Sequence, residues 1–394
     1  MKRIYFICLF LCLTVLFAVR PAQAQTETVL YNFSGGSDGG YPYSNLTFDS
    51  AGNLYGTTYG GGTFGYGTVF EVSPNGNGGW NEAVLYSFTG GADGSEPFGP
   101  VIFDSVGNLY GTTYAGGANG FGAVFELSPV GTSWMETVLY SFAGGTDGAY
   151  PRAGLIMDPA GNLYGATFGS EPYYPGTVFE LSPSGGGWKE QVIYAVNMAS
   201  GVTMDPYGNI FGVNGSTAFE LSPNGNGGWN STVIHTFPTG PKDGSGAWGT
   251  PVLDQAGNLY GTTFEGGVGD LGTVYRLSPV ETGKKKGEWK EKILESFRNN
   301  ENHGPIQGAY PYAGVVFDRG NIYVTTVEGG KHLCGGIFVL LFPSYHEKYP
   351  LWGFNGEDGF QPYASVILDG AGNLYGTTLY GGSGAHGVVF EVSP

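Results

Sequence analysis

Three of the five histidines lie toward the end of the chain in segments that are predicted to be loops of one face. They are His303, His332 and His386, and Cys334 follows His332 by two residues. Imidazole and thiolate groups are the ligands that zinc and copper prefer, and histidine is the usual acid or base at neutral pH. No pair among them has a recognised zinc spacing. They are therefore candidates for a transition-metal or catalytic site, and chance proximity is the competing interpretation.

A second candidate set is an aspartate followed by glycine in five Gly-rich segments: Asp38, Asp93, Asp147, Asp243 and Asp358. Clustered carboxylates bind hard cations such as Ca²⁺. An aspartate before glycine is also typical of a turn in which the carboxylate accepts backbone N–H groups. One carboxylate per segment is sparse for a cation, so we expect the turn role and no cofactor, with Ca²⁺ as the alternative.

Segments of the same kind carry a large side chain, in most cases directly after a proline. The set is Tyr43, Phe98, Arg152, Trp248, Tyr312 and Tyr363. Sugar rings stack on aromatic side chains, and ligand pockets combine apolar walls with a few polar groups. Aromatic rings also pack against one another. These residues are predicted either to bind a ligand or to plug the space that they line.

A repeated element positions all three sets. Seven copies of Gly-Asn-Leu/Ile-Tyr/Phe occur, and the aspartates that open the copies are 47 to 64 residues apart. Each repeat contains four strand-like runs, as in PFGPVIFD, GNLYGTTY, GAVFELSP and WMETVLYSF within residues 97–142. Four strands in a period near 50 residues indicate one blade of a β-propeller. The candidate residues then fall in the loops of one face, with the aromatic set near the central channel.

The two ends of the repeat region predict how the ring closes. TETVLYNF at residues 26–33 matches the fourth strand of a blade, and GVVFEVSP at the end matches the third. We therefore predict a seven-bladed, all-β propeller over residues 25–394, in which the N-terminal strand completes the last blade and leaves no open sheet edge. The predicted blades span about 41–88, 96–142, 150–196, 199–237, 247–297, 310–354 and 361–394.

The first 24 residues have the pattern of a secretory signal peptide. Lys2 and Arg3 precede an apolar run, and Ala22-Gln23-Ala24 supplies a small-x-small cleavage site. Cys334 is the only cysteine after this segment, so an intramolecular disulfide is excluded. The formal net charge of −17 disfavours nucleic acid and anionic membranes as partners. We expect an extracellular or periplasmic monomer without stable membrane insertion.

The GNLYGTT, GTVFEL and ETVLYSF units resemble the bacterial GloVer-type tandem-repeat (choice-of-anchor) family over essentially all of residues 26–394. The resemblance implies an exported repeat protein, and the absence of an anchor after Pro394 favours free secretion. It implies no activity that can be assigned to particular residues. A looser resemblance, in strand pattern alone, exists to NHL repeat proteins and streptogramin lyases.

Two functions remain open at this point. Repetition of the aromatic and aspartate positions favours a binding scaffold for an extracellular glycan or a cell-surface partner. The histidine positions do not repeat from blade to blade, which favours a lyase or hydrolase with a single site at the channel mouth on blades six and seven.

Overall fold

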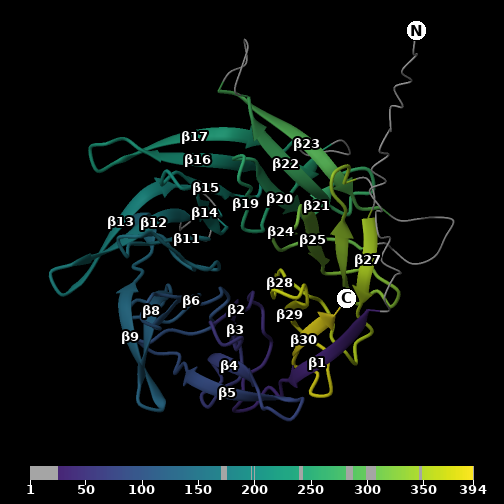
Figure 1. Ribbon diagram of the computed structural model, residues 1–394. Coiled ribbons are helices and arrows are strands. Elements are labelled where there is room, and N and C mark those ends of the chain that lie inside the picture. The colour runs from purple at the N-terminus through teal and green to yellow at the C-terminus, as the bar shows by residue number, and fades with distance from the viewer. Residues whose placement is uncertain are drawn as a thin grey trace, which may run out of the picture.

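The computed structural model describes residues 25–169, 175–196, 198, 200–238, 243–280, 287–298, 308–345 and 348–393. Seven four-stranded antiparallel sheets are arranged as a ring (Figure 1). The first strand of each sheet lies toward the centre of the ring and the fourth lies at its outside. The predicted seven-bladed β-propeller is confirmed.

Blades 1 to 4 follow one another along the chain. Blade 1 contains β2 (Thr47–Phe48), β3 (Leu54–Thr58), β4 (Thr68–Pro74) and β5 (Trp80–Ser87), and blade 2 contains β6 (Ile102–Phe103), β7 (Leu109–Thr113), β8 (Ala123–Val130) and β9 (Ser133–Ser141). Blade 3 contains β10 (Ile156–Met157), β11 (Leu163–Thr167), β12 (Thr177–Ser184) and β13 (Gly187–Ala195), and blade 4 contains β14 (Val202–Met204), β15 (Ile210–Val213), β16 (Thr217–Pro223) and β17 (Trp229–Thr236).

Blades 5 to 7 complete the ring. Blade 5 contains β19 (Val252–Leu253), β20 (Leu259–Thr263), β22 (Thr273–Pro279) and β23 (Trp289–Ser296), and blade 6 contains β24 (Val316–Asp318), β25 (Asn321–Thr326), β26 (Gly336–Leu340) and β27 (Lys348–Gly353). Blade 7 contains β28 (Ile367–Leu368), β29 (Leu374–Thr378), β30 (Val388–Ser393) and β1 (Thr26–Asn32). A short sheet of β18 (Gly244–Ser245) and β21 (Glu265–Gly266) and the 3-10 turn η1 (Gly145–Asp147) lie in the loops.

Blade 7 is built from both ends of the repeat region. Strand β1 pairs antiparallel with β30, from Thr26 opposite Ser393 to Asn32 opposite Val388. Figure 1 shows the purple β1 beside the yellow β30. The predicted closure by the N-terminal strand is confirmed, and it covers the edge that β30 would otherwise expose.

The repeated motif forms a turn and a buried second strand. In blade 1, Asp49 Oδ1 accepts hydrogen bonds from the backbone N–H groups of Ala51 and Asn53, at 2.8 and 2.9 Å. The same two bonds occur at Asp104, Asp158, Asp205, Asp254 and Asp369. In the following strand, a Cβ on Gly56 would lie 2.6 Å from Phe70 Cζ. The glycine therefore leaves room for the ring of the third strand.

Buried aromatic pairs join neighbouring blades. Phe33, which follows β1 of blade 7, packs edge-on against Phe70 of blade 1, with centroids 5.1 Å apart. Equivalent pairs are Phe88–Phe125, Phe142–Phe179, Phe237–Tyr275, Phe297–Phe338 and Phe354–Phe390. Val196 takes the place of the phenylalanine between blades 3 and 4. Apolar burial between blades is therefore repeated around the ring, and it is the main source of stability.

Threonines of the second strands add hydrogen bonds between blades. Thr57 Oγ1 donates to the carbonyl of Gly99 in blade 2 at 3.1 Å. Equivalent bonds of 2.7 to 3.0 Å are Thr112 to Ala153, Thr262 to Ala313, Thr325 to Ala364 and Thr377 to Ser44. Blades 3 and 4 have Ala166 and Val213 at this position and cannot make the bond. Blade 4 is thus joined to blade 3 and to blade 5 without this threonine hydrogen bond.

Candidate functional site

The centre of the ring contains a candidate binding site. A cavity of about 850 Å³ runs between the first strands, where small residues keep the inner wall thin: Ser44, Gly154, Gly201, Gly249, Gly314 and Ala364. A second cavity of about 420 Å³ adjoins it, and the two share Tyr43, Phe98, Tyr312 and Tyr363. Both volumes fall in the range of about 300–1,000 Å³ that is common for ligand sites.

The structure brings the aromatic residues predicted from the sequence to this channel. Tyr43 and Tyr363 stack with ring centroids 4.9 Å apart, and Tyr312 lies edge-on to Tyr363 at 5.4 Å. Phe98 packs edge-on against Tyr43 at 5.2 Å. Trp248 continues the lining on the far side of the cavity. Side chains from five blades therefore converge on one apolar wall, and they both pack together and border open volume.

Arg152 is the charged member of this lining. Its guanidinium carbon lies 4.4 Å from the ring centroid of Phe168, 5.0 Å from Tyr114 and 5.7 Å from Phe98. The side chain is exposed, and no ion pair to it is found among the described residues. Cation–π contacts fix the guanidinium while its N–H groups remain able to donate to a ligand oxygen.

Two tyrosines of the channel, Tyr43 and Tyr363, remain neutral at physiological pH. Burial, and then the neighbouring Tyr312, raises the pKa of Tyr43 far above its usual range. Burial, and then Tyr312 and Tyr380, also raises the pKa of Tyr363. Their hydroxyls can therefore donate and accept hydrogen bonds but do not supply a phenolate base.

Four of the five predicted aspartates are held by hydrogen bonds within their own blade junction. Asp38 accepts from the backbone N–H of Ser34 at 2.8 Å and from the hydroxyl of Tyr31 at 3.0 Å. Asp93, Asp147 and Asp358 accept equivalent bonds from Tyr86, Tyr140 and the indole N–H of Trp352. Burial would raise the pKa of Asp38, but the bonds from Ser34 and Tyr31 together lower it. This geometry is that of the expected turn.

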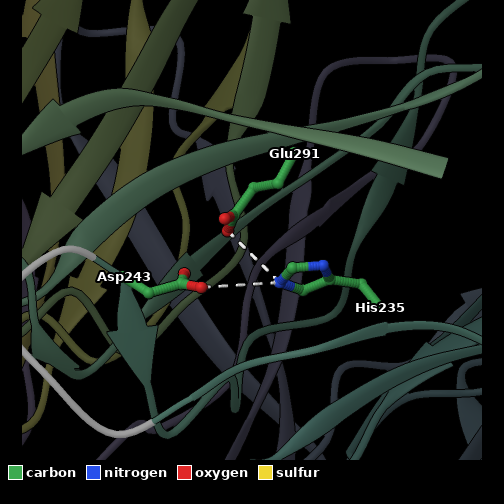
Figure 2. A group of neighbouring side chains, drawn as sticks. All are labelled: His235, Asp243 and Glu291. Atoms are coloured by element: carbon green, nitrogen blue, oxygen red, sulfur yellow. Dashed lines mark ion pairs between the residues drawn. The ribbon is translucent and has the colours of Figure 1, made fainter.

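Asp243 has different neighbours (Figure 2). Its Oδ2 lies 3.8 Å from Nε2 of His235, and the same nitrogen lies 3.5 Å from Oε1 of Glu291. His235 is on β17, Glu291 is on β23 of the next blade, and Asp243 precedes β18. Asp243 was among the aspartates predicted from the sequence, whereas His235 and Glu291 were not predicted as site residues. The available signal was the histidine of VIHTF at the position of the tyrosine in VLYSF.

Two members of the predicted histidine set lie within the described residues, in the loops between the second and third strands of blades 6 and 7. His303 lies outside the described residues. His332 is exposed in the β25–β26 loop, where its carbonyl accepts from the Cys334 thiol at 3.4 Å. His386 lies in the β29–β30 loop, edge-on to Tyr41 with centroids 5.0 Å apart. No group of three potential metal ligands within the described residues includes either histidine.

The sequence was compared with known families. The model of the Gloeobacter/Verrucomicrobia repeat matches residues 13–217 and again residues 200–394. The chain belongs to this family. The predicted GloVer-type resemblance is thus confirmed. A comparison with curated proteins found no sequence similar to this repeat protein.

Several solved structures share the propeller fold. Virginiamycin B lyase from Staphylococcus aureus is 15% identical with a TM-score of 0.58, and the match covers 94% of this chain and 99% of that chain. Extracellular domains of the hybrid two component systems BT3049 and BT4673 from B. thetaiotaomicron are each 14% identical, with TM-scores of 0.56 and 0.58. These matches cover 94% of this repeat protein but only 41% and 42% of those chains. Identities this low establish the fold alone.

Helices play almost no part in this architecture. Within the described residues, none is long and apolar enough to cross a bilayer.

Proposed function

We propose that the protein is an exported binding scaffold that holds a neutral glycan at the mouth of its central channel. The observation that carries the proposal is the set of aromatic side chains from several blades, with Arg152 among them, around adjoining cavities of about 420 and 850 Å³. Flat apolar rings beside a few hydrogen-bond donors match the alternating apolar and hydroxyl faces of a sugar.

Charge supports a neutral ligand. The chain carries a formal net charge of −17, which disfavours polyanions in general. Arg152 is the charged side chain of the channel wall, and its contacts with three rings leave its N–H groups for hydroxyl oxygens. A sugar hydroxyl needs no opposite charge in return, so the acidic surface does not oppose binding.

Export is part of the proposal. The pattern of residues 1–24 predicts a cleaved leader, and glycans of this kind are accessible outside the cytoplasm. Amino-terminal sequencing of the exported protein should begin at Gln25. A start at Met1 in the exported fraction would contradict cleavage.

The binding test is a glycan array probed with purified protein, followed by calorimetry on the best ligand. Tyr363→Ala should weaken that ligand by about 30-fold, the effect of losing one aromatic hot spot of about 2 kcal/mol. Tyr363→Phe should retain most of the affinity because the stacking ring is kept. Phe342→Ala is the matched control, since Phe342 is 60% exposed and does not line the channel. Equal binding by Tyr363→Ala and the wild type would refute this site.

A further inference from the structure

The blade junctions share one polar arrangement near the outer edge of the ring. In the junction between blades 1 and 2, the hydroxyl of Tyr86 donates to Asp93 at 3.1 Å, and Glu136 of β9 lies close enough to raise the pKa of Tyr86. Oε1 of Glu136 is buried without a hydrogen-bond partner among the described residues. Equivalent trios are Tyr31–Asp38–Glu82, Tyr140–Asp147–Glu190 and Trp352–Asp358–Glu27.

Histidine replaces the O–H or N–H donor in the junction between blades 4 and 5. His235 lies opposite Ala218 in the β16–β17 pair, as Tyr86 lies opposite Val69 in the β4–β5 pair. The His235 side chain is 17% exposed, and its Nε2 has no hydrogen-bond partner among the described residues. The same is true of Oε1 of Glu291. The nitrogen faces both carboxylates (Figure 2) at distances too long for strong hydrogen bonds.

Burial and the neighbouring carboxylates together set the protonation of this trio. Burial lowers the pKa of His235, and Asp243 only partly opposes that effect. Burial, and then Asp243, raises the pKa of Glu291 to about 8. A divalent cation would reverse this balance, because metal ligands must be deprotonated.

The distances suit a small metal ion. Ligand atoms about 2.0–2.2 Å from a tetrahedral zinc ion lie roughly 3.4 Å from one another. Here two separations are 3.5 and 3.8 Å, and all three ligand atoms lie within 4.8 Å of one another. One imidazole nitrogen and two carboxylate oxygens form a borderline donor set, which favours zinc over calcium.

We propose that His235, Asp243 and Glu291 form a zinc-type divalent metal site that clamps blade 4 to blade 5. The ligands come from β17, from the segment before β18 and from β23, so one ion would hold both blades. Blade 4 also has Val213 where five of the other blades have the threonine that bonds to the next blade. The metal would therefore stabilise a junction that lacks this hydrogen bond. The proposal is independent of glycan binding at the channel.

The test begins with tag-free protein that has been stripped with chelator and titrated with zinc alone. We expect one zinc per chain after gel filtration and a higher melting temperature with zinc than without it. Failure to retain zinc would overturn the proposal.

The other junctions supply matched variants. His235→Tyr installs the residue found in four of them and should abolish zinc retention and the zinc-dependent rise in melting temperature. Glu291→Gln, which keeps the side-chain size, should give the same result if His235→Tyr fails to fold. Tyr86→His should create a second site with Asp93 and Glu136 and raise the stoichiometry to two. Unchanged zinc binding in both His235→Tyr and Glu291→Gln would place the metal elsewhere and refute the proposal.

Discussion

The buried glutamates of the blade junctions predict an unusual dependence of stability on pH. Burial, and then a nearby aspartate, raises the pKa of Glu82, Glu136 and Glu190 from 4.5 to about 7. A carboxyl group with a raised pKa in the folded state favours the fold while it is protonated. This contribution is fully present below pH 4.5 and is lost as the pH rises through about 7.

The size of the effect follows from the pKa values. At about 1.36 kcal/mol per pKa unit, ionisation of one such glutamate would cost the folded state at most about 3.4 kcal/mol. The side chains are only partly buried, so solvent screening reduces this to about 1 kcal/mol each. Replacing all three by glutamine removes the ionisable groups and keeps their size. The triple variant should therefore gain about 3 kcal/mol over the wild type between pH 5 and pH 8.

The assay is thermal melting of both proteins from pH 5 to pH 8. With an unfolding entropy of about 2.1 cal/mol/K per residue, 3 kcal/mol corresponds to a relative rise of about 4 °C for a chain of this length. Glu357→Gln is the control, because Glu357 is exposed, and its difference from the wild type should not vary with pH. A triple variant whose difference in melting temperature stays constant over this range would refute the reasoning.

Three further outcomes are expected from denaturant and thermal unfolding. Thr112→Val removes the bond to the Ala153 carbonyl and should lower the free energy of unfolding by about 1–3 kcal/mol, whereas an unchanged value would show that the bond is not needed. Gly56→Ala places a Cβ against Phe70 and should lower the free energy of unfolding by about 1–3 kcal/mol through overpacking; an unchanged value would show that the Phe70 ring moves aside. Deleting residues 26–33 removes β1 from blade 7 and should abolish the single cooperative melting transition; the same melting curve as the wild type would contradict the closure.

The fold could be predicted because its determinants are local and repeated. Each GNLYGTT segment specifies a turn and a buried strand, and the match of residues 26–33 to other fourth strands specified the closure. The aromatic set was also predictable, since most of its members follow prolines at equivalent repeat positions that the fold brings to the channel. The sequence did not determine whether those aromatic side chains fill the channel or line it, because that depends on the radius of the propeller.

The junction trio could not be predicted as a set. His235 and Glu291 are 56 residues apart on the fourth strands of different blades, and their contact depends on how the blades are stacked. His303, His332 and His386 were candidates because all three were predicted to lie in loops of one face on the last two blades. The structure places His332 and His386 in loops of different blades.

Variation among the seven junctions separates structural residues from candidate functional ones. A tyrosine, an aspartate and a glutamate recur where the only need is to join blades. Between blades 5 and 6 the tyrosine position holds Glu295 and the glutamate position holds Lys348, and the two form an ion pair at 2.9 Å. That exchange preserves a favourable contact by another means, so it needs no ligand. His235 keeps both carboxylates but holds Nε2 at 3.5 and 3.8 Å from them, beyond the length of a strong hydrogen bond, and a bound metal ion would bridge this gap.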